Sequence, residues 1–161
     1  MKRGYPIAIA ISVALSGLAC AHPPKSYSFT LAQPKDAMDV VLRTLATNGF
    51  KDVAVDSAKS TVITQWFDTG YRYRATSEIN NGPVRKYYTD VFLRYRISVL
   101  DKHGQQTVTL ETDVQRCAPT DSVITAQGVD GTCLPMTEVF PTQQDQVDDM
   151  GNKLKLALSG G

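Results

Sequence analysis

The sequence predicts an α+β domain in which an antiparallel β-sheet of four to five strands carries two amphipathic helices on one of its faces. Segments with apolar residues at every second position make up most of the middle of the chain, as strands of a half-buried sheet do. Two further segments have apolar residues at helical spacing and bracket that region. Because each of these helices has one apolar face, both must bury it against the sheet.

Length and composition predict one domain and no nucleic-acid partner. The 161 residues are 42% hydrophobic and 20% charged, a composition typical of a soluble protein whose length suits a single core. Lys and Arg number 17 and Asp and Glu number 16. A chain so nearly balanced in charge has no strong field to attract nucleic acid.

Residues 1–19 have the three parts of a secretory signal. Lys2 and Arg3 precede an apolar run, residues 7–15, that is much shorter than the roughly 20 residues of a bilayer span. The small residues 16–19 then lead to Cys20. This ending resembles the lipobox of bacterial lipoproteins.

The lipobox resemblance implies cleavage before Cys20 and acylation of that cysteine, palmitate included. Several acyl chains on one residue anchor a protein stably in a membrane. Because Ala21 rather than Asp follows the cysteine, the resemblance implies the outer membrane, with the protein facing the periplasm. Residues 20–26 are then the lipidated cysteine and a short spacer, and residues 27–161 a single periplasmic domain. The alternative is a cleaved signal with a free cysteine.

Two cysteines, Cys117 and Cys133, remain in the mature chain. In an oxidising compartment an even pair predicts a disulfide. The bridge would close a loop of about 16 residues and stabilise the fold by about 3 kcal/mol. A metal site is the alternative, but no cysteine or histidine cluster stands near the pair in sequence.

The first half of the mature chain predicts a strand, a helix and further strands. Residues 25–31 alternate as a short strand, and the segment that follows Pro34 predicts a helix of about 14 residues that stops at Gly49. Residues 53–55 predict another strand. Residues 61–67 are β-branched and aromatic and predict the next one, which residues 71–75 could extend.

A hairpin and a second helix complete the prediction. Two alternating segments flank a turn at residues 101–104, and the register that we predict puts Ile97 opposite Val108 and Arg94 opposite Glu111. The last helix covers residues 142–158. We expect Thr142 to begin it, with Asp145 in a capping box.

No motif or cluster predicts an active site, a metal site or a cofactor. The histidines are His22, beside the anchor, and His103, in the hairpin turn. A nucleophile therefore has no evident base, and the chain lacks the G-x-S-x-G, H-E-x-x-H and P-loop patterns. The sequence predicts a protein that is not an enzyme.

Aromatic residues interleaved with arginines form the candidate interface, because this combination is enriched at protein–protein contacts. The residues are Trp66, Tyr71, Arg72, Tyr73, Arg74 and Arg85. The alternative is an ordinary edge strand, whose alternation puts Tyr71 and Tyr73 on one face and the arginines on the other. Trp66 taken alone is more typical of a core.

Several segments resemble the domain of BamC-type outer-membrane lipoproteins. The match consists of a helix that ends with Leu45, Gly49 and Phe50, a strand with Thr61, Val62, Thr64 and Trp66, and the closing helix from Val147 to Leu158. The resemblance implies a helix-grip fold and a role beside the machinery that inserts β-barrels into the outer membrane.

We therefore expect an outer-membrane lipoprotein that binds another envelope protein. The runner-up is a module that binds a small molecule or lipid in a cleft between helix and sheet. A third hypothesis is an inhibitor that recognises its target through the loop between Cys117 and Cys133.

Overall fold

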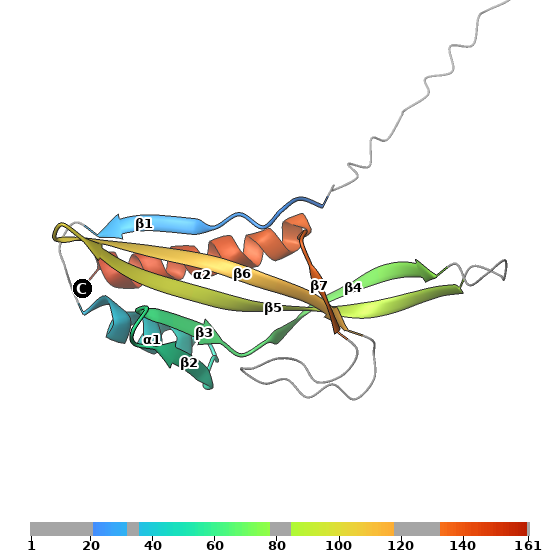
Figure 1. The fold of residues 1–161 in the computed structure, drawn as a ribbon, viewed down its shortest axis with the longest axis horizontal. Coiled ribbons are helices and arrows are strands. Elements are labelled where there is room, and N and C mark those ends of the chain that lie inside the picture. The colour runs from blue at the N-terminus through green and yellow to red at the C-terminus, as the bar shows by residue number, and fades with distance from the viewer. Residues whose placement is uncertain (1–20, 32–35, 78–84, 118–132, 161) are drawn as a thin grey trace, which may run out of the picture.

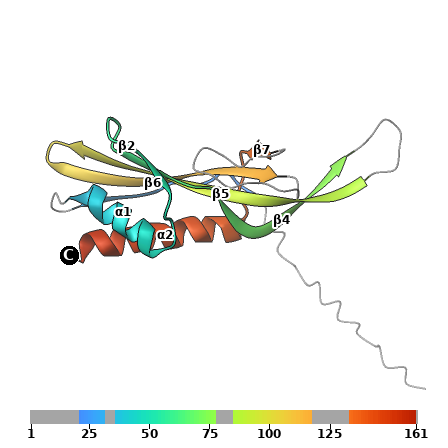
Figure 2. The same cartoon turned by 90° about the horizontal axis from the view of Figure 1, so that it is seen from below.

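The computed structural model describes residues 21–31, 36–77, 85–117 and 133–160, and these form one antiparallel sheet with two helices on one face (Figures 1 and 2). The elements in chain order are β1 (Tyr27–Leu31), α1 (Ala37–Thr47), β2 (Val53–Asp56), β3 (Thr61–Thr64), β4 (Phe67–Ser77), β5 (Arg85–Lys102), β6 (Gln105–Cys117), β7 (Cys133–Met136) and α2 (Pro141–Ser159). The α+β class with an antiparallel sheet and two helices is confirmed.

The sheet has seven strands within the described residues, so the prediction of four to five was too low. Its main path runs β1-β6-β5-β3-β2, while β4 pairs with β5 and β7 pairs with β6 farther along the same two long strands. Local sequence pattern does not predict β7, because this strand is short and contains Pro135. Its pairing places Cys133 opposite Cys117, a contact that local pattern does not encode.

The predicted strand 61–67 is wrong at its end, because β3 stops at Thr64 and β4 begins at Phe67. Both strands pair with β5, so they follow one edge with a break at residues 65–66. The Thr64 hydroxyl accepts the Tyr95 backbone N–H at 2.9 Å where the ladder is interrupted. A side chain thus satisfies a buried backbone donor that would otherwise lack a partner.

The hairpin of β5 and β6 forms on the predicted faces but in a different register. His103 and Gly104 both have positive φ, 55° and 79°, as in a two-residue type I′ turn. Lys102 therefore pairs with Gln105, and Arg94 lies opposite Asp113 rather than Glu111. A shift of two residues returns every side chain to the same face, so hydrophobic alternation does not distinguish the two registers.

The same shift changes the apolar partners, since Ile97 lies opposite Leu110 instead of Val108. The two residues still face the helices, and both are buried in the main core. That core fills the space between sheet and helices. Its buried residues from the helices include Val41, Leu45 and Leu154.

The end of α1 follows the prediction. Gly49 has φ of 91°, the left-handed conformation that favours glycine. The Phe50 N–H donates to the Leu45 carbonyl at 3.0 Å and the Gly49 N–H to the Ala46 carbonyl at 3.1 Å, which is a Schellman motif. It turns the chain so that the Phe50 ring packs edge-on against Phe67 and Tyr95.

Helix α2 begins one residue before the predicted start. Pro141 occupies the first helical position and Phe140 is the N-cap residue, so Thr142 and Asp145 do not form the expected capping box. Instead, the Gln143 side-chain oxygen accepts the Phe140 N–H at 2.9 Å. The start is therefore set by the proline and by Gln143.

Strand β1 packs directly on α2 where Gly151 leaves room. A Cβ atom at Gly151 would collide with the Tyr27 ring, and the Tyr27 hydroxyl donates to Asn152 Oδ1 at 2.6 Å. The glycine is thus required by a close approach of ring and helix. Glycine lowers helix stability by about 1 kcal/mol relative to alanine, and the contact with Tyr27 offsets this loss.

We predict that Gly151→Ala lowers the free energy of unfolding by about 1–3 kcal/mol, because overpacking outweighs the better helix propensity of alanine. Chemical denaturation measures the change. Lys155→Ala, at an exposed position of the same helix, is the control and should change stability by less than about 0.5 kcal/mol. A stabilised Gly151→Ala chain would show that the Tyr27 contact is dispensable.

Tyr95 connects the sheet to α2 by donating its hydroxyl to the Gln146 carbonyl at 3.1 Å. Burial of the ring raises the pKa of the Tyr95 hydroxyl above its usual value near 10, and the charge of Asp149 adds to the effect. Because the folded-state pKa is the higher one, the neutral tyrosine stabilises the fold below pH 10. This contribution is lost as the pH rises toward the folded-state pKa.

We predict that the free energy of unfolding falls as the pH rises above about 10, by up to about 1.4 kcal/mol per pH unit from this residue. Tyr95→Phe should cost about 1 kcal/mol at neutral pH through the lost hydrogen bond, and should make the alkaline decline less steep. Denaturant unfolding between pH 7 and 11 measures both effects. Equal slopes in the two chains would contradict the assignment to Tyr95.

Candidate functional site

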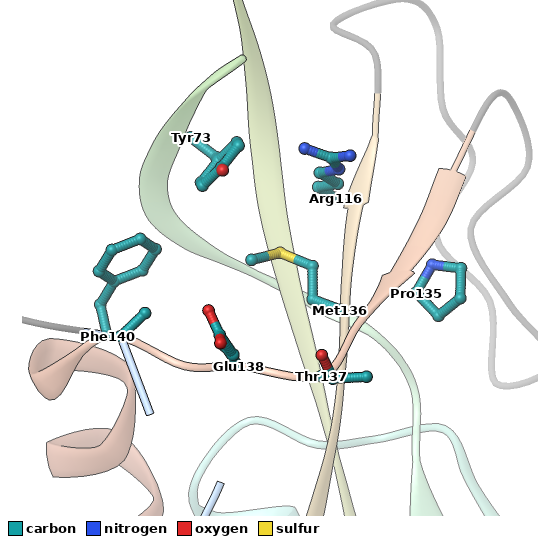
Figure 3. Close-up of a pocket in the computed structure, with 8 residues that line it drawn as sticks. Tyr73, Arg116, Pro135, Met136, Thr137, Glu138 and Phe140 are labelled. Atoms are coloured by element: carbon teal, nitrogen blue, oxygen red, sulfur yellow. The ribbon is translucent and has the colours of Figure 1, made fainter. Parts of the chain in front are cut away.

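A groove of about 530 Å³ lies beside the start of α2, where the pairing of β5 with β6 ends, between β4, the end of β6 and the segment that joins β7 to α2 (Figure 3). We call it the β7 groove. The residues that line it include Ala21, Tyr73, Arg116, Met136, Glu138 and Phe140. They combine aromatic and apolar surface with one cation and one anion.

The groove exists because β4, β5 and the end of β6 extend beyond the part of the sheet that the helices cover (Figures 1 and 2). Their helix-side residues form a second core with Val91, Leu93 and Val114, which Val139 covers just before α2. Tyr73 packs at the margin of this core. A sheet longer than its helices thus leaves a recess at its end.

Aromatic contacts form one wall of the groove. The Tyr71 ring lies 4.7 Å from the Phe140 ring and the Tyr73 ring 6.2 Å from it, measured between centroids. The Arg116 guanidinium lies over the Tyr73 ring at 5.1 Å, a cation–π contact. Tyr71 and Tyr73 of the candidate interface therefore face the helix side.

Strand β4 also carries Arg72, which lies on the opposite face. Its guanidinium pairs with Asp90 at 3.2 Å, and 73% of its side chain is exposed. A bulge between Asp68 and Arg72 determines which face of the sheet each of these side chains occupies. Within the bulge Gly70 has φ of 71°, and its N–H donates to Asp68 Oδ1 at 2.8 Å. The alternation of Tyr71, Arg72 and Tyr73 is as expected for an edge strand.

Arg74 and Arg85 belong to β4 and β5, where Arg74 pairs with Tyr88 and Arg85 with Ser77. Their side chains lie outside the described part of the structure. Cys20, the predicted lipidation site, also lies outside the described residues, as does the predicted signal, residues 1–19. The geometry of the candidate interface is therefore that of Trp66, Tyr71, Arg72 and Tyr73.

Trp66 is separated from the two tyrosines because it lies on the helix-free face. It is buried, with 5% of its surface exposed, against Phe92 and the disulfide. The Arg94 guanidinium lies 4.7 Å from the centre of its ring, and Arg94 and Arg96 share Asp113 at 2.7 and 2.8 Å. The structure thus divides the described candidate residues between two faces.

The segment after Cys20 is docked on the domain. The His22 N–H donates to the Val139 carbonyl at 3.0 Å, and the Val139 N–H donates to the His22 carbonyl at 2.8 Å. The Gln144 side chain makes a second clamp, since its oxygen accepts the Lys25 N–H at 2.9 Å and its amide donates to the Lys25 carbonyl at 3.2 Å. The described part of the predicted spacer therefore lies along the body beside the groove.

The sequence pattern does not mark Arg116, Met136, Glu138 and Phe140 as residues of a groove. They come from the end of β6 and from the stretch between Pro135 and Pro141, which has no helical or strand periodicity of its own. Two prolines close together with an aromatic residue just before the second are the available signal. That signal indicates an extended segment before a helix, but not what it faces.

The described residues contain no cluster of three or more metal-ligating side chains. His103 occupies the hairpin turn, and the His22 ring contacts the Pro23 carbonyl at 2.8 Å. In the part of the chain that the structure describes, no helix has the length and apolar character needed to cross a bilayer.

Comparisons with family models and with curated protein sequences find no match. Among solved structures, the chain is similar to a DUF4468 family protein from Bacteroides ovatus, with a TM-score of 0.43 and 15% sequence identity. The alignment covers 83% of this chain and 84% of that one. A likeness at this level does not identify a family or an activity.

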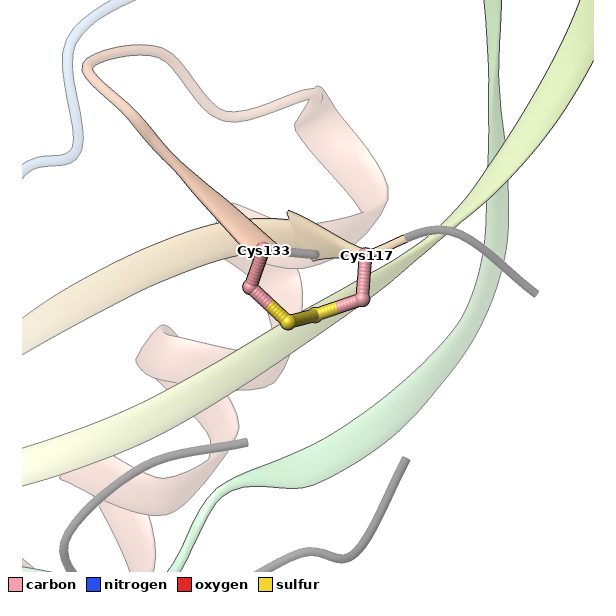
Figure 4. Close-up of a disulfide and its surroundings, with 2 residues drawn as sticks. All are labelled: Cys117 and Cys133. Atoms are coloured by element: carbon pink, nitrogen blue, oxygen red, sulfur yellow. A yellow bond between two sulfur atoms is a disulfide. The ribbon is translucent and has the colours of Figure 1, made fainter. Parts of the chain in front are cut away.

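The predicted disulfide is present and connects the paired ends of β6 and β7 (Figure 4). The sulfur atoms of Cys117 and Cys133 lie 2.08 Å apart, and Cys117 is fully buried. The bond holds β7, and with it Met136, beside the groove. The loop of the inhibitor hypothesis, residues 118–132, lies outside the described residues.

We predict that replacing both cysteines by serine lowers the free energy of unfolding by about 3 kcal/mol, because the unfolded chain loses a loop constraint. Denaturant unfolding with and without reductant measures the effect. Reductant should destabilise the wild-type chain by a similar amount and leave the double variant unchanged. Equal stability of the two oxidised chains would contradict the prediction.

Proposed function

We propose that this chain is a non-enzymatic lipoprotein of the bacterial outer membrane, anchored through acylated Cys20, whose periplasmic domain binds another envelope protein. An accessory role in outer-membrane protein assembly is the form that the BamC-type resemblance supports. The proposal includes a helix-grip arrangement of the BamC-like kind. The long helix α2, which lies along one face of the sheet, supports that arrangement (Figure 2).

The observation that carries the protein-binding role is the edge of β4. Strand β4 pairs with β5 along residues 67–77, and within the described chain no strand pairs with its other side. Beyond the reach of β6, β4 and β5 form a two-stranded ribbon that projects from the body (Figure 1). An unpaired edge on a projecting ribbon is a template for a strand of another chain.

Addition of a partner strand to β4 would combine backbone hydrogen bonds with side-chain contacts. Backbone hydrogen bonds supply affinity, and alternate side chains supply specificity. Tyr71 and Tyr73 present aromatic surface on the helix side, while Arg72 presents a charge on the other. A partner strand with apolar residues on one face and an acidic residue on the other would fit this edge.

The small-molecule hypothesis is not favoured in its original location, between helix and sheet. The side chains there are packed, and Tyr95, Ile97 and Leu110 are at most 3% exposed. The recess available to a ligand is instead the β7 groove.

We predict near-stoichiometric recovery of an envelope protein when the tagged, lipidated chain is cross-linked briefly and purified in mild detergent. Arg72→Glu should reduce this recovery about tenfold, because it places a like charge opposite the acidic partner. Mass spectrometry of the eluate identifies and quantifies the partner.

Lys59→Glu is the matched control, since Lys59 is a similarly exposed cation that also pairs with one aspartate, Asp56 at 3.5 Å. It should leave recovery unchanged. Circular dichroism verifies that both variants fold. A preparation without a partner, or equal loss in both variants, would overturn the proposed role of β4.

A further inference from the structure

The N-terminal segment fixes the β7 groove next to the anchor. Ala21 lines the groove, and His22 is held by two hydrogen bonds to Val139. Lys25 is held a second time by the Gln144 side chain. Because the segment is docked at His22 and Lys25, no flexible linker separates the groove from the residue before Ala21.

The residue before Ala21 is Cys20, which one peptide bond joins to Ala21. If the acyl chains of Cys20 are in the bilayer, as the proposed function holds, the groove lies at the membrane surface. This step rests on the proposed anchor.

The groove holds two opposite charges that do not pair with each other. Arg116 has no ion-pair partner within the described chain, and its guanidinium only covers the Tyr73 ring. The Glu138 carboxylate is exposed and likewise forms no ion pair there. Figure 3 shows Met136 between the two. A ligand that satisfies both needs an anionic and a cationic group separated by a short spacer.

The other walls suit a ligand at a membrane surface. Tyr73 has an amphipathic ring of the kind that favours the boundary between headgroups and hydrocarbon, and Phe140 adds apolar aromatic surface. Met136 adds a flexible apolar surface. The volume of about 530 Å³ is within the range of small-ligand sites.

We propose that the β7 groove binds the headgroup of a zwitterionic phospholipid of the membrane that holds the anchor. The phosphate accepts hydrogen bonds from the Arg116 guanidinium, and the primary ammonium donates to the Glu138 carboxylate. An arginine is well suited to phosphate oxygens because its donors form a planar fork. The lipid then holds the domain in one orientation, with the β4 edge at a set height above the bilayer.

A photo-crosslinking amino acid at Thr137, an exposed residue that lines the groove, tests this proposal. The full, lipidated chain is placed in vesicles of phosphatidylethanolamine and irradiated, and intact mass detects captured lipid. The same probe at Lys102, in the hairpin at the other end of the sheet, is the positional control (Figure 1). We expect capture at Thr137 and none at Lys102.

Arg116→Gln and Glu138→Gln should each reduce capture at Thr137 about tenfold, as the loss of a charge-assisted hydrogen bond predicts. Arg43→Gln, at an exposed arginine of α1, should leave capture unchanged. Capture unaffected by the two groove substitutions would overturn the proposal. Equal capture from vesicles of phosphatidylglycerol, which lacks the ammonium, would overturn the zwitterionic assignment.

The intact mass separates this proposal from the proposed function. An acylated chain without lipid capture retains the anchor and overturns the headgroup site. For a chain with free Cys20, soluble dihexanoyl phosphatidylethanolamine presents the same headgroup, and its Arg116-dependent capture would support the site without the anchor. Capture of a co-purified protein at Thr137 in place of lipid would assign the groove to a protein partner and overturn the proposal.

Discussion

The pairing of β5 with β6 is the constraint on which the rest of the structure depends. It runs from Asp90 opposite Cys117 to Lys102 opposite Gln105, closed by the two-residue turn at His103 and Gly104. In the described chain, β3 and β4 pair with the edge of β5 that faces away from β6. Strands β1 and β7 pair with the edge of β6 that faces away from β5. Both helices pack on the face that this hairpin presents. Its length therefore decides how much of the sheet the helices leave uncovered.

The uncovered end gathers the features that the functional proposals use. The β4 edge, the β7 groove and the disulfide all lie where the long strands run beyond α2 (Figure 1). A compact domain with helices as long as its strands would bury this surface. Here the aromatic contacts of Tyr71 and Tyr73 with Phe140 close the end of the core and leave the edge of the ribbon available.

The docked N-terminal segment relates the proposed anchor to both proposed binding surfaces. Because His22 pairs with Val139 and Lys25 with Gln144, a lipidated Cys20 would hold the domain closely instead of through a free linker. A closely held domain has few orientations, which lowers the entropic cost of meeting a partner in the same membrane. The proposed protein and lipid contacts are compatible, since they use different surfaces of one end.

The sequence by itself determined both helices, most of the strands and the apolar faces of the hairpin, because those properties depend on local periodicity and on single residues such as Gly49. It also indicated the disulfide through cysteine number. It did not reveal β7 or the break between β3 and β4. Only the tertiary structure decided the hairpin register, since a two-residue shift preserves the faces, and the separation of Trp66 from Tyr71 and Tyr73. Local sequence pattern also did not predict the groove that Arg116, Glu138 and Phe140 line. It forms where strands of unequal length, a disulfide and a helix start meet, and long-range contacts alone bring these together.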